Sequence, residues 1–210
     1  MAFAVNAAKT RLRNNELSIG IGIRLVRNVD IIKVMKAAGF DWLFIDLEHG
    51  SMSIEAACEI AVAAQDSGIA PIVRVPYGEL TMATRVLDGG ALGVVIPHVD
   101  TPEEAKEIAD KLRYPPRGHR SVGGGQAQFD YAPMPLGEMT TKIDDNTLIT
   151  VMIETPKAVE NVRRLVESDQ VALVFNVLGT PLNMAIRPYM NQKKVPQLFI
   201  AAGATAFNDP

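Results

Sequence analysis

The chain has 210 residues, of which 48% are hydrophobic and 21% are charged, and its net charge is −3 at pH 7. This balance is typical of one soluble globular domain, and it gives no electrostatic case for binding nucleic acid or an anionic membrane surface. The single cysteine, Cys58, excludes an internal disulfide and fits a reducing compartment. No secretory leader is recognisable, and no apolar run reaches the ~18 residues of a membrane helix, so we expect a cytoplasmic protein.

Strand-like and helix-like segments alternate along the chain, separated by turn residues. Apolar runs predict strands at 18–25, 41–47, 71–75, 92–97, 147–153, 171–177 and 197–202. Helical periodicity predicts helices at 30–38, 54–65, 80–87, 101–112, 156–167 and 182–191. Ser53 is a plausible N-cap and Gly68 a stop signal. A long loop rich in glycine and proline is expected from Tyr114 to about Pro135.

Strands that alternate with helices indicate parallel βαβ units, and strands that are apolar on both faces fit a parallel sheet covered by helices. The expected class is therefore α/β with about six to seven βα units. A closed barrel and an open doubly wound sheet both fit this pattern. A complete eight-unit barrel needs about 250 residues, so the chain is short for one.

Functional groups of parallel α/β proteins gather at the C-terminal ends of strands, and four successive predicted strands end in polar side chains. They are Asp46, Glu48 and His49 after the second strand, Arg74 in the third, His98 and Asp100 after the fourth and Glu154 after the fifth. Arginine binds carboxylates, a carboxylate can hold a divalent cation, and a histidine preceded by an aspartate three residues earlier can act as a base. Such a set suits proton abstraction next to a carbonyl.

These residues also have structural explanations. Asp46 and Glu154 could cap the turns that follow them, His49 could be a hydrogen-bonded structural histidine, and Arg74 could form an internal ion pair. An arginine inside an apolar strand is costly to bury without a partner, which favours an anion-binding role for Arg74.

Three further residues are weaker candidates. His98 precedes helix-capping residues, which lowers the case for a direct catalytic role. His119, in the long loop, is explained equally well as solvent-exposed or as adjacent to a substrate. Cys58 lies in an apolar helical run and is better explained as a small buried residue than as a nucleophile.

The strand ends and one loop resemble the HpcH/HpaI family, the 2,4-dihydroxyhept-2-ene-1,7-dioate aldolases and their relatives acting on 2-keto-3-deoxy sugar acids. The resemblance extends over about residues 20–161, and the loop at 113–123 is its most specific part. The matching stretches are 40–49, 71–75, 95–101, 113–123 and 152–155. The fold that this resemblance implies is a (β/α) TIM-type barrel, which this chain would form incompletely.

The resemblance also implies roles for particular residues. It implies that His49, paired with Asp46, is the general acid and base, and that Arg74 binds the carboxylate of pyruvate and stabilises the enolate. Glu154 matches a metal ligand for Mg²⁺, Mn²⁺ or Co²⁺. The resemblance also implies that Gly123 and Gly124, in the loop, bind the substrate together with Arg74. The implied reaction cleaves a 4-hydroxy-2-oxo acid to pyruvate and an aldehyde, without a Schiff-base lysine.

The sequence departs from the family pattern in one respect. The family has a second metal ligand, an aspartate after the sixth strand, whereas residues 175–183 contain no aspartate. We therefore expect reduced metal affinity and low or absent aldolase activity.

Residues 163–210 resemble a different family, the branched-chain-amino-acid-type binding proteins of ABC transporters. The stretches that carry this resemblance are 178–181, 193–199 and 207–210. They suggest a chimera, with an aldolase-like part at 1–162 joined near residues 157–166 to a tail at 163–210. The alternative function is thus a non-catalytic or solute-binding fragment. An incomplete barrel leaves open sheet edges, so we expect marginal stability or a homo-oligomer.

Overall fold

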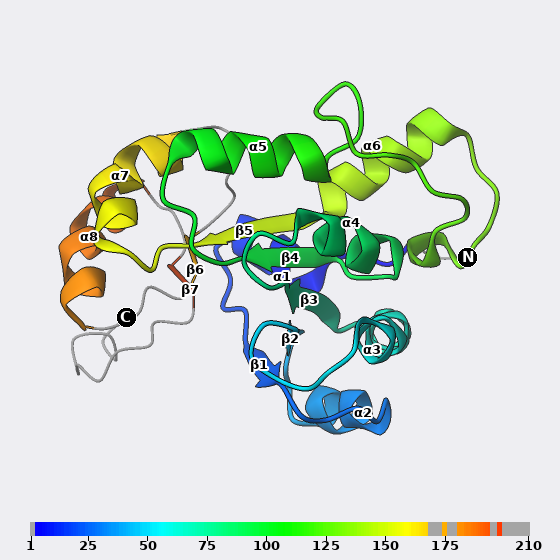
Figure 1. The fold of residues 1–210 in the computed structure, drawn as a ribbon. Helices are drawn as coiled ribbons and strands as arrows, with labels where there is room; N and C mark the ends of the chain where they lie inside the picture. Colours follow the sequence, from blue (N-terminus) through cyan, green and yellow to red (C-terminus); the bar gives the residue numbers. More distant parts are fainter. Residues whose placement is uncertain (1–2, 168–173, 176–179, 194–196, 199–210) are drawn as a thin grey trace. The chain divides into compact units, whose positions relative to one another are not determined.

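The computed structural model describes residues 3–167, 174–175, 180–193 and 197–198. The helices are α1 (Ala7–Arg13), α2 (Asp30–Ala37), α3 (Ile54–Asp66), α4 (Leu80–Asp88), α5 (Pro102–Leu112), α6 (Leu136–Asn146), α7 (Pro156–Glu167) and α8 (Thr180–Lys193), with a short 3₁₀ helix at Ala127–Phe129. The strands are β1 (Gly20–Ile23), β2 (Trp42–Asp46), β3 (Ala70–Arg74), β4 (Gly93–Ile96), β5 (Leu148–Met152), β6 (Val174–Phe175) and β7 (Gln197–Leu198) (Figure 1).

The strands follow one another in the sheet in sequence order, from β1 to β7. The pairings β1–β2, β2–β3, β5–β6 and β6–β7 are all parallel. This confirms the predicted α/β class with a parallel sheet. Within the described residues the strand order has two ends, β1 and β7, and does not close on itself.

Helix ends follow the predicted capping residues. The Ser53 hydroxyl accepts a hydrogen bond from the Ala56 N–H at the start of α3, and Gly68 just past its end has φ +66°. At the start of α5, the Thr101 hydroxyl accepts from the Glu104 N–H, while the Glu104 carboxylate accepts from the Thr101 N–H. This reciprocal arrangement is a capping box, and it ends the β4–α5 connection at a defined residue.

Two helices, α1 and α6, were not expected from the sequence. Helix α6 contains adjacent threonines, which lower helix propensity, and it directly follows the long loop. It is stabilised by packing instead, because Met139 and Ile143 lie on one face and join a core cluster with Tyr114 and Phe129. Phe3 stacks on Phe129 with ring centroids 4.7 Å apart, and this contact ties the start of the chain to the same cluster.

The chain divides into two compact units, Met1–Val94 with Asp110–Leu148, and Val95–Ala109 with Ile149–Pro210. In the first unit, α3 packs against β3 (Figure 1). All five residues of β3 are buried. In the second unit, α7 packs against α8, where the Arg163 guanidinium lies 5.3 Å from the Tyr189 ring centroid. The predicted boundary between 162 and 163 stays a prediction. No helix in the described ranges is long and apolar enough to cross a membrane.

Candidate functional site

Asp46 and Arg74 lie side by side at the C-terminal ends of β2 and β3. The parallel pairing of these strands puts the two residues in register, so both side chains stand at the same edge of the sheet. Arg74 Nε donates to Asp46 Oδ1 at 2.9 Å, and Arg74 Nη2 donates to Asp46 Oδ2 at 2.7 Å. The side chains are 9% and 1% exposed, respectively. The result is a buried, two-point ion pair of the kind that a planar guanidinium favours.

Glu48 brings a second carboxylate to the same guanidinium. Its Oε2 lies 3.1 Å from Arg74 Nη1, and its side chain is only 10% exposed. This oxygen has no partner of hydrogen-bond geometry within the described residues, so its contact with Arg74 is chiefly electrostatic. The Arg74 guanidinium also lies 5.3 Å from the centroid of the Phe44 ring. Two carboxylates and one aromatic face thus fix the position of Arg74 before any ligand arrives.

Opposing effects set the pKa of Asp46. Burial raises the pKa, because an ionised carboxylate is costly away from water. The hydrogen bond and charge of Arg74, together with the backbone N–H groups of Glu48 and His49, outweigh burial and bring the pKa below its ordinary value. Asp46 is therefore ionised at neutral pH, and it remains a hydrogen-bond acceptor only.

His49 contacts Asp46 through its backbone rather than through its imidazole. The His49 N–H donates to Asp46 Oδ1 at 3.2 Å, whereas His49 Nε2 lies 3.8 Å from Glu48 Oε2. The His49 side chain is 61% exposed. The structure thus places His49 beside the Asp46–Arg74 pair, with its ring accessible to a ligand, and its nearest recorded acidic neighbour is Glu48. The predicted role of the Asp46–His49 pair in acid and base catalysis stays a prediction.

Two arginines that follow β1 lie over the turn after β2. Arg24 Nε donates to the carbonyl oxygen of His49 at 2.7 Å and lies 3.1 Å from Asp46 Oδ2. Arg27 Nη2 donates to the carbonyl oxygen and the hydroxyl of Ser51, at 2.7 and 3.0 Å. Neither arginine is among the residues that the sequence predicts for the site. The signal was available, because Arg24 stands at the end of a predicted strand just as the other candidates do.

Glu154 lies in the second unit, together with His98. Glu154 Oε2 accepts a hydrogen bond from the His98 N–H at 3.2 Å and lies 3.5 Å from His98 Nδ1. The Glu154 side chain is 14% exposed. His98 has φ +54°, a left-handed conformation that few residues other than glycine adopt. The turn after β4 is therefore held in a strained conformation beside the Glu154 carboxylate.

Glu154 does not cap α7, which removes one of its structural explanations. The cap is Thr155, whose hydroxyl accepts from the Ala158 N–H at 3.0 Å and donates to Asp100 Oδ1 at 2.5 Å. Asn161 Nδ2 donates to the carbonyl oxygen of Asp100 at 3.2 Å. These bonds connect the turns after β4 and β5 within the second unit, and they position the Glu154 backbone.

The loop that carries Gly123 and Gly124 is exposed at both glycines, and a Cβ added at Gly124 would meet nothing within 4 Å. The loop is anchored by Arg120, which is 3% exposed. Its guanidinium stacks 4.6 Å from the Tyr114 ring centroid and forms an ion pair with Asp88. The substrate contacts expected for Gly123 and Gly124 stay a prediction. The open space at these glycines leaves room for such contacts.

Two weaker candidates have ordinary environments. His119 is 82% exposed, and its Nδ1 lies 2.6 Å from Asp110 Oδ1 on α5. Cys58 is half-buried, and burial raises the pKa of its thiol, against a smaller opposing effect of Arg85. A raised thiol pKa disfavours the reactive thiolate, so the environment of Cys58 agrees with a packing role.

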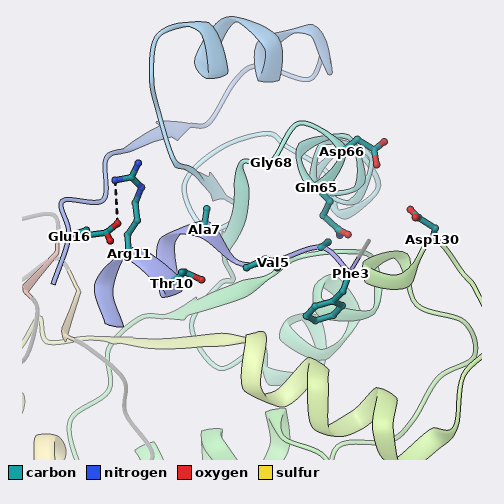
Figure 2. Close-up of a pocket in the computed structure, with 11 residues that line it drawn as sticks. Phe3, Val5, Ala7, Thr10, Arg11, Glu16, Gln65, Asp66, Gly68 and Asp130 are labelled. Atoms are coloured by element: carbon teal, nitrogen blue, oxygen red, sulfur yellow. Dashed lines mark ion pairs between the residues drawn. The ribbon is translucent and has the colours of Figure 1, made fainter. Parts of the chain in front are cut away.

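A cavity of about 690 Å³ lies in the first unit, away from the strand ends just described. Figure 2 shows its walls, which come from α1 and the segment before it, from the C-terminal end of α3 and from Asp130. Glu16 and Gly68 in its lining precede β1 and β3, so the cavity opens at the N-terminal ends of the strands. Chemistry in β/α architectures resides at the opposite ends, and we therefore place the candidate site at Asp46, His49 and Arg74 rather than in this cavity.

The described residues contain no cluster of three or more His, Cys, Asp or Glu side chains that could hold a metal ion. Glu154 fits a divalent cation in part: its carboxylate oxygens are the ligand type that Mg²⁺ and Mn²⁺ prefer, and its side chain is not fully buried. Residues 176–179, within the stretch that lacks the family's second aspartate, lie outside the described residues.

Comparison with solved structures gives a close match in fold. The crystal structure of an HpcH/HpaI aldolase from Desulfitobacterium hafniense DCB-2 superposes with a TM-score of 0.84 at 26% identity, covering 95% of this chain and 84% of that chain. Among curated proteins, the 4-hydroxy-4-methyl-2-oxoglutarate aldolase tasA of Hapsidospora irregularis is 38% identical over 174 residues. That match covers 82% of this chain but 62% of the relative, so the chain spans less than two thirds of that protein's length.

The matches continue past the predicted join at residues 157–166. The hydroxypyruvate/pyruvate aldolase of Roseobacter denitrificans is 30% identical over 205 residues, which is 94% of this chain and 76% of that protein. The predicted likeness of residues 163–210 to ABC-transporter binding proteins finds no support in these matches. The model of the HpcH/HpaI aldolase/citrate lyase family matches residues 25–187. The chain belongs to the HpcH/HpaI aldolase/citrate lyase family.

Proposed function

We propose that this chain is a carbon–carbon lyase of the pyruvate-enolate type, which cleaves 4-hydroxy-2-oxo acids to pyruvate and an aldehyde. The observation that carries this proposal is the buried guanidinium of Arg74, fixed at the end of β3 by two carboxylates beside an exposed imidazole. Family membership and the aldolase names of the relatives from Hapsidospora and Roseobacter support the same reaction class.

Arg74 would bind the carboxylate of the 2-oxo acid and stabilise the negative charge that develops on the enolate oxygen. A guanidinium fixed in advance needs little reorganisation when that charge forms, which favours this role. His49 would move the proton, because its exposed ring lies at the same strand edge. Asp46 would hold Arg74 and the turn that carries His49 in place.

The proposed cofactor is a divalent cation, with Mg²⁺, Mn²⁺ or Co²⁺ as candidates and Glu154 as one ligand. When bound, such an ion would polarise the carbonyl oxygen of the 2-oxo acid. Since residues 175–183 lack the aspartate expected in the family, we propose that metal affinity and aldolase activity are low. A homo-oligomeric assembly and a cytoplasmic location also remain predictions.

The exchange of pyruvate methyl protons with deuterium, followed by NMR, tests this proposal without requiring knowledge of the aldehyde. We expect metal-dependent exchange by the unmodified chain, little or no exchange by His49→Gln, and slower exchange at a given pyruvate concentration by Arg74→Lys. His119→Gln is the matched control, because His119 is an exposed histidine paired with Asp110. Exchange that is absent at every metal concentration, or unchanged in His49→Gln, would contradict the proposed enolate chemistry.

A further inference from the structure

Arg24 places a second guanidinium on the Asp46 carboxylate. Its Nε lies 3.1 Å from Asp46 Oδ2, the oxygen that also accepts the 2.7 Å hydrogen bond from Arg74 Nη2. Two arginines from different strand ends, β1 and β3, therefore meet at one carboxylate oxygen. They lie within the reach of a single small molecule bound at this edge of the sheet.

The two arginines differ in how much of each is available to a ligand. The Arg74 side chain is 9% exposed, whereas that of Arg24 is 56% exposed. The recorded contacts of Arg24 use its Nε alone, for Asp46 and for the carbonyl oxygen of His49. In the described part of the chain, no contact is recorded for Nη1 or Nη2 of Arg24. These two nitrogens carry four N–H donors and form the outer edge of the guanidinium.

Stability of the fold does not explain Arg24. An ion pair with a solvent-exposed arginine contributes only about 0–1 kcal/mol, and Asp46 already has a buried arginine as its partner. Arg27, which also follows β1, contacts the same turn through Ser51. The outer edge of the Arg24 guanidinium is therefore left to bind an anionic ligand, since only its Nε has a recorded contact with the described residues.

We propose that Arg24 binds a second carboxylate of the substrate, so that the preferred ligands are 2-oxo dicarboxylates rather than 2-oxo monocarboxylates. This inference rests on the proposed function, since Arg74 would hold the first carboxylate. The carbonyl fragment released with pyruvate then carries a carboxylate of its own. Arg24 determines specificity and takes no part in the proton transfer.

Two ligands of equal chain length isolate the contribution of the second charge. 2-Oxoglutarate and 2-oxopentanoate share the 2-oxo acid end and differ at the terminal carbon, which is a carboxylate in the first and a methyl group in the second. Their dissociation constants are measured by calorimetry with the full chain at constant Mn²⁺. We expect the unmodified chain to bind 2-oxoglutarate about tenfold or more tightly than 2-oxopentanoate, as one charge-assisted hydrogen-bond pair allows.

The variant Arg24→Gln should lose most of this preference, because its 2-oxoglutarate affinity falls far more than its affinity for 2-oxopentanoate. Arg24→Lys should restore part of it, since lysine keeps the charge without the planar pair of donors. Arg164→Gln is the control for a general loss of positive charge, because Arg164 is exposed and paired with Glu103. It should keep the full preference.

Equal binding of the two ligands by the unmodified chain would overturn the inference, as would equal loss of both affinities in Arg24→Gln. The test is separate from that of the enolate chemistry. A chain that prefers 2-oxoglutarate through Arg24 but exchanges no methyl protons would refute the proposed reaction and keep the dicarboxylate site. A chain that exchanges methyl protons but binds 2-oxoglutarate and 2-oxopentanoate equally would support the proposed reaction and refute the dicarboxylate site.

Discussion

Replacing Arg74 with methionine tests how strongly the site is stabilised by its central ion pair. The substitution removes the partner of Asp46, which is 1% exposed, and of Glu48, which is 10% exposed. Breaking a buried pair by removing one partner typically costs about 3–5 kcal/mol, because a buried charge is left uncompensated. Two carboxylates are affected here, although Arg24 and two backbone N–H groups remain on Asp46. We expect a loss in this range.

The loss should depend on pH in a defined direction. In the unmodified chain the pKa of Asp46 is lowered, so Asp46 contributes stability above its unfolded pKa and loses that contribution as pH falls through the folded value. Without Arg74, burial dominates and raises the pKa of Asp46. The variant then becomes relatively more stable as pH falls and the carboxyl takes up a proton.

The measurement is urea unfolding of both proteins at a series of pH values between 7 and 4. The difference in unfolding free energy should be largest near pH 7 and should shrink toward pH 4. Adding Asp46→Asn to Arg74→Met should restore part of the loss, because the buried charge is removed. A cost below about 1 kcal/mol at pH 7, or one that is constant with pH, would show that the pair is not stabilising in the way its burial suggests.

Three other substitutions test separate features. Burial, aided by the charge of Arg13, lowers the pKa of Lys9 to about 8. Between this value and the ordinary 10.5 only the unfolded chain holds the proton, so the free energy of unfolding should rise with pH by on the order of 3 kcal/mol relative to Lys9→Met, measured by urea unfolding. His98→Gly should be more stable than His98→Ala by about 1 kcal/mol in thermal unfolding, because only glycine relieves the left-handed backbone. Glu154→Gln should weaken Mn²⁺ binding at least about tenfold in calorimetry, and unchanged affinity would exclude Glu154 as a ligand.

The sequence could predict the parallel sheet and most of its elements, because buried strands such as β4 are continuously apolar and helices such as α3 carry clear end signals. It could not predict α6, since the stability of that helix comes from Met139 and Ile143 packing on Tyr114 and Phe129. Those residues are brought together by tertiary structure, and a local pattern of eleven residues with adjacent threonines does not reveal it.

The site shows the same division between local and tertiary information. Asp46 and Arg74 could be singled out as strand-end residues, and the pairing of β2 with β3 then puts them in register. The partner of the His49 imidazole could not be derived from sequence spacing, because a spacing of three residues fits both a backbone and a side-chain contact with Asp46. Arg24 stands at the end of the first predicted strand, but this position alone does not show that its guanidinium reaches Asp46 after the second strand.

The contacts of Asp46 lead to a last prediction about its role. A carboxylate offers about four lone-pair sites, and Asp46 already accepts from Arg74 twice and from the N–H groups of Glu48 and His49, with Arg24 nearby. Little capacity remains for orienting the His49 ring. We therefore expect Asp46→Asn to raise the KM for pyruvate in methyl exchange, because the two-point ion pair that holds Arg74 in place is lost. His49→Gln should mainly lower kcat.

The two variants distinguish two roles of Asp46: holding Arg74 in place, or acting on the His49 ring as one half of a catalytic dyad. In a dyad, Asp46 acts through the imidazole, so removing its charge lowers kcat about as much as removing the ring and leaves the KM for pyruvate in place. If Asp46 holds Arg74 in place, Asp46→Asn raises the KM for pyruvate. Arg74→Lys should also raise this KM, because lysine cannot reproduce the two-point contact. An unchanged KM in Asp46→Asn, with a kcat as low as that of His49→Gln, would support the catalytic dyad instead. The His49 ring would then have to turn toward Asp46 when substrate binds.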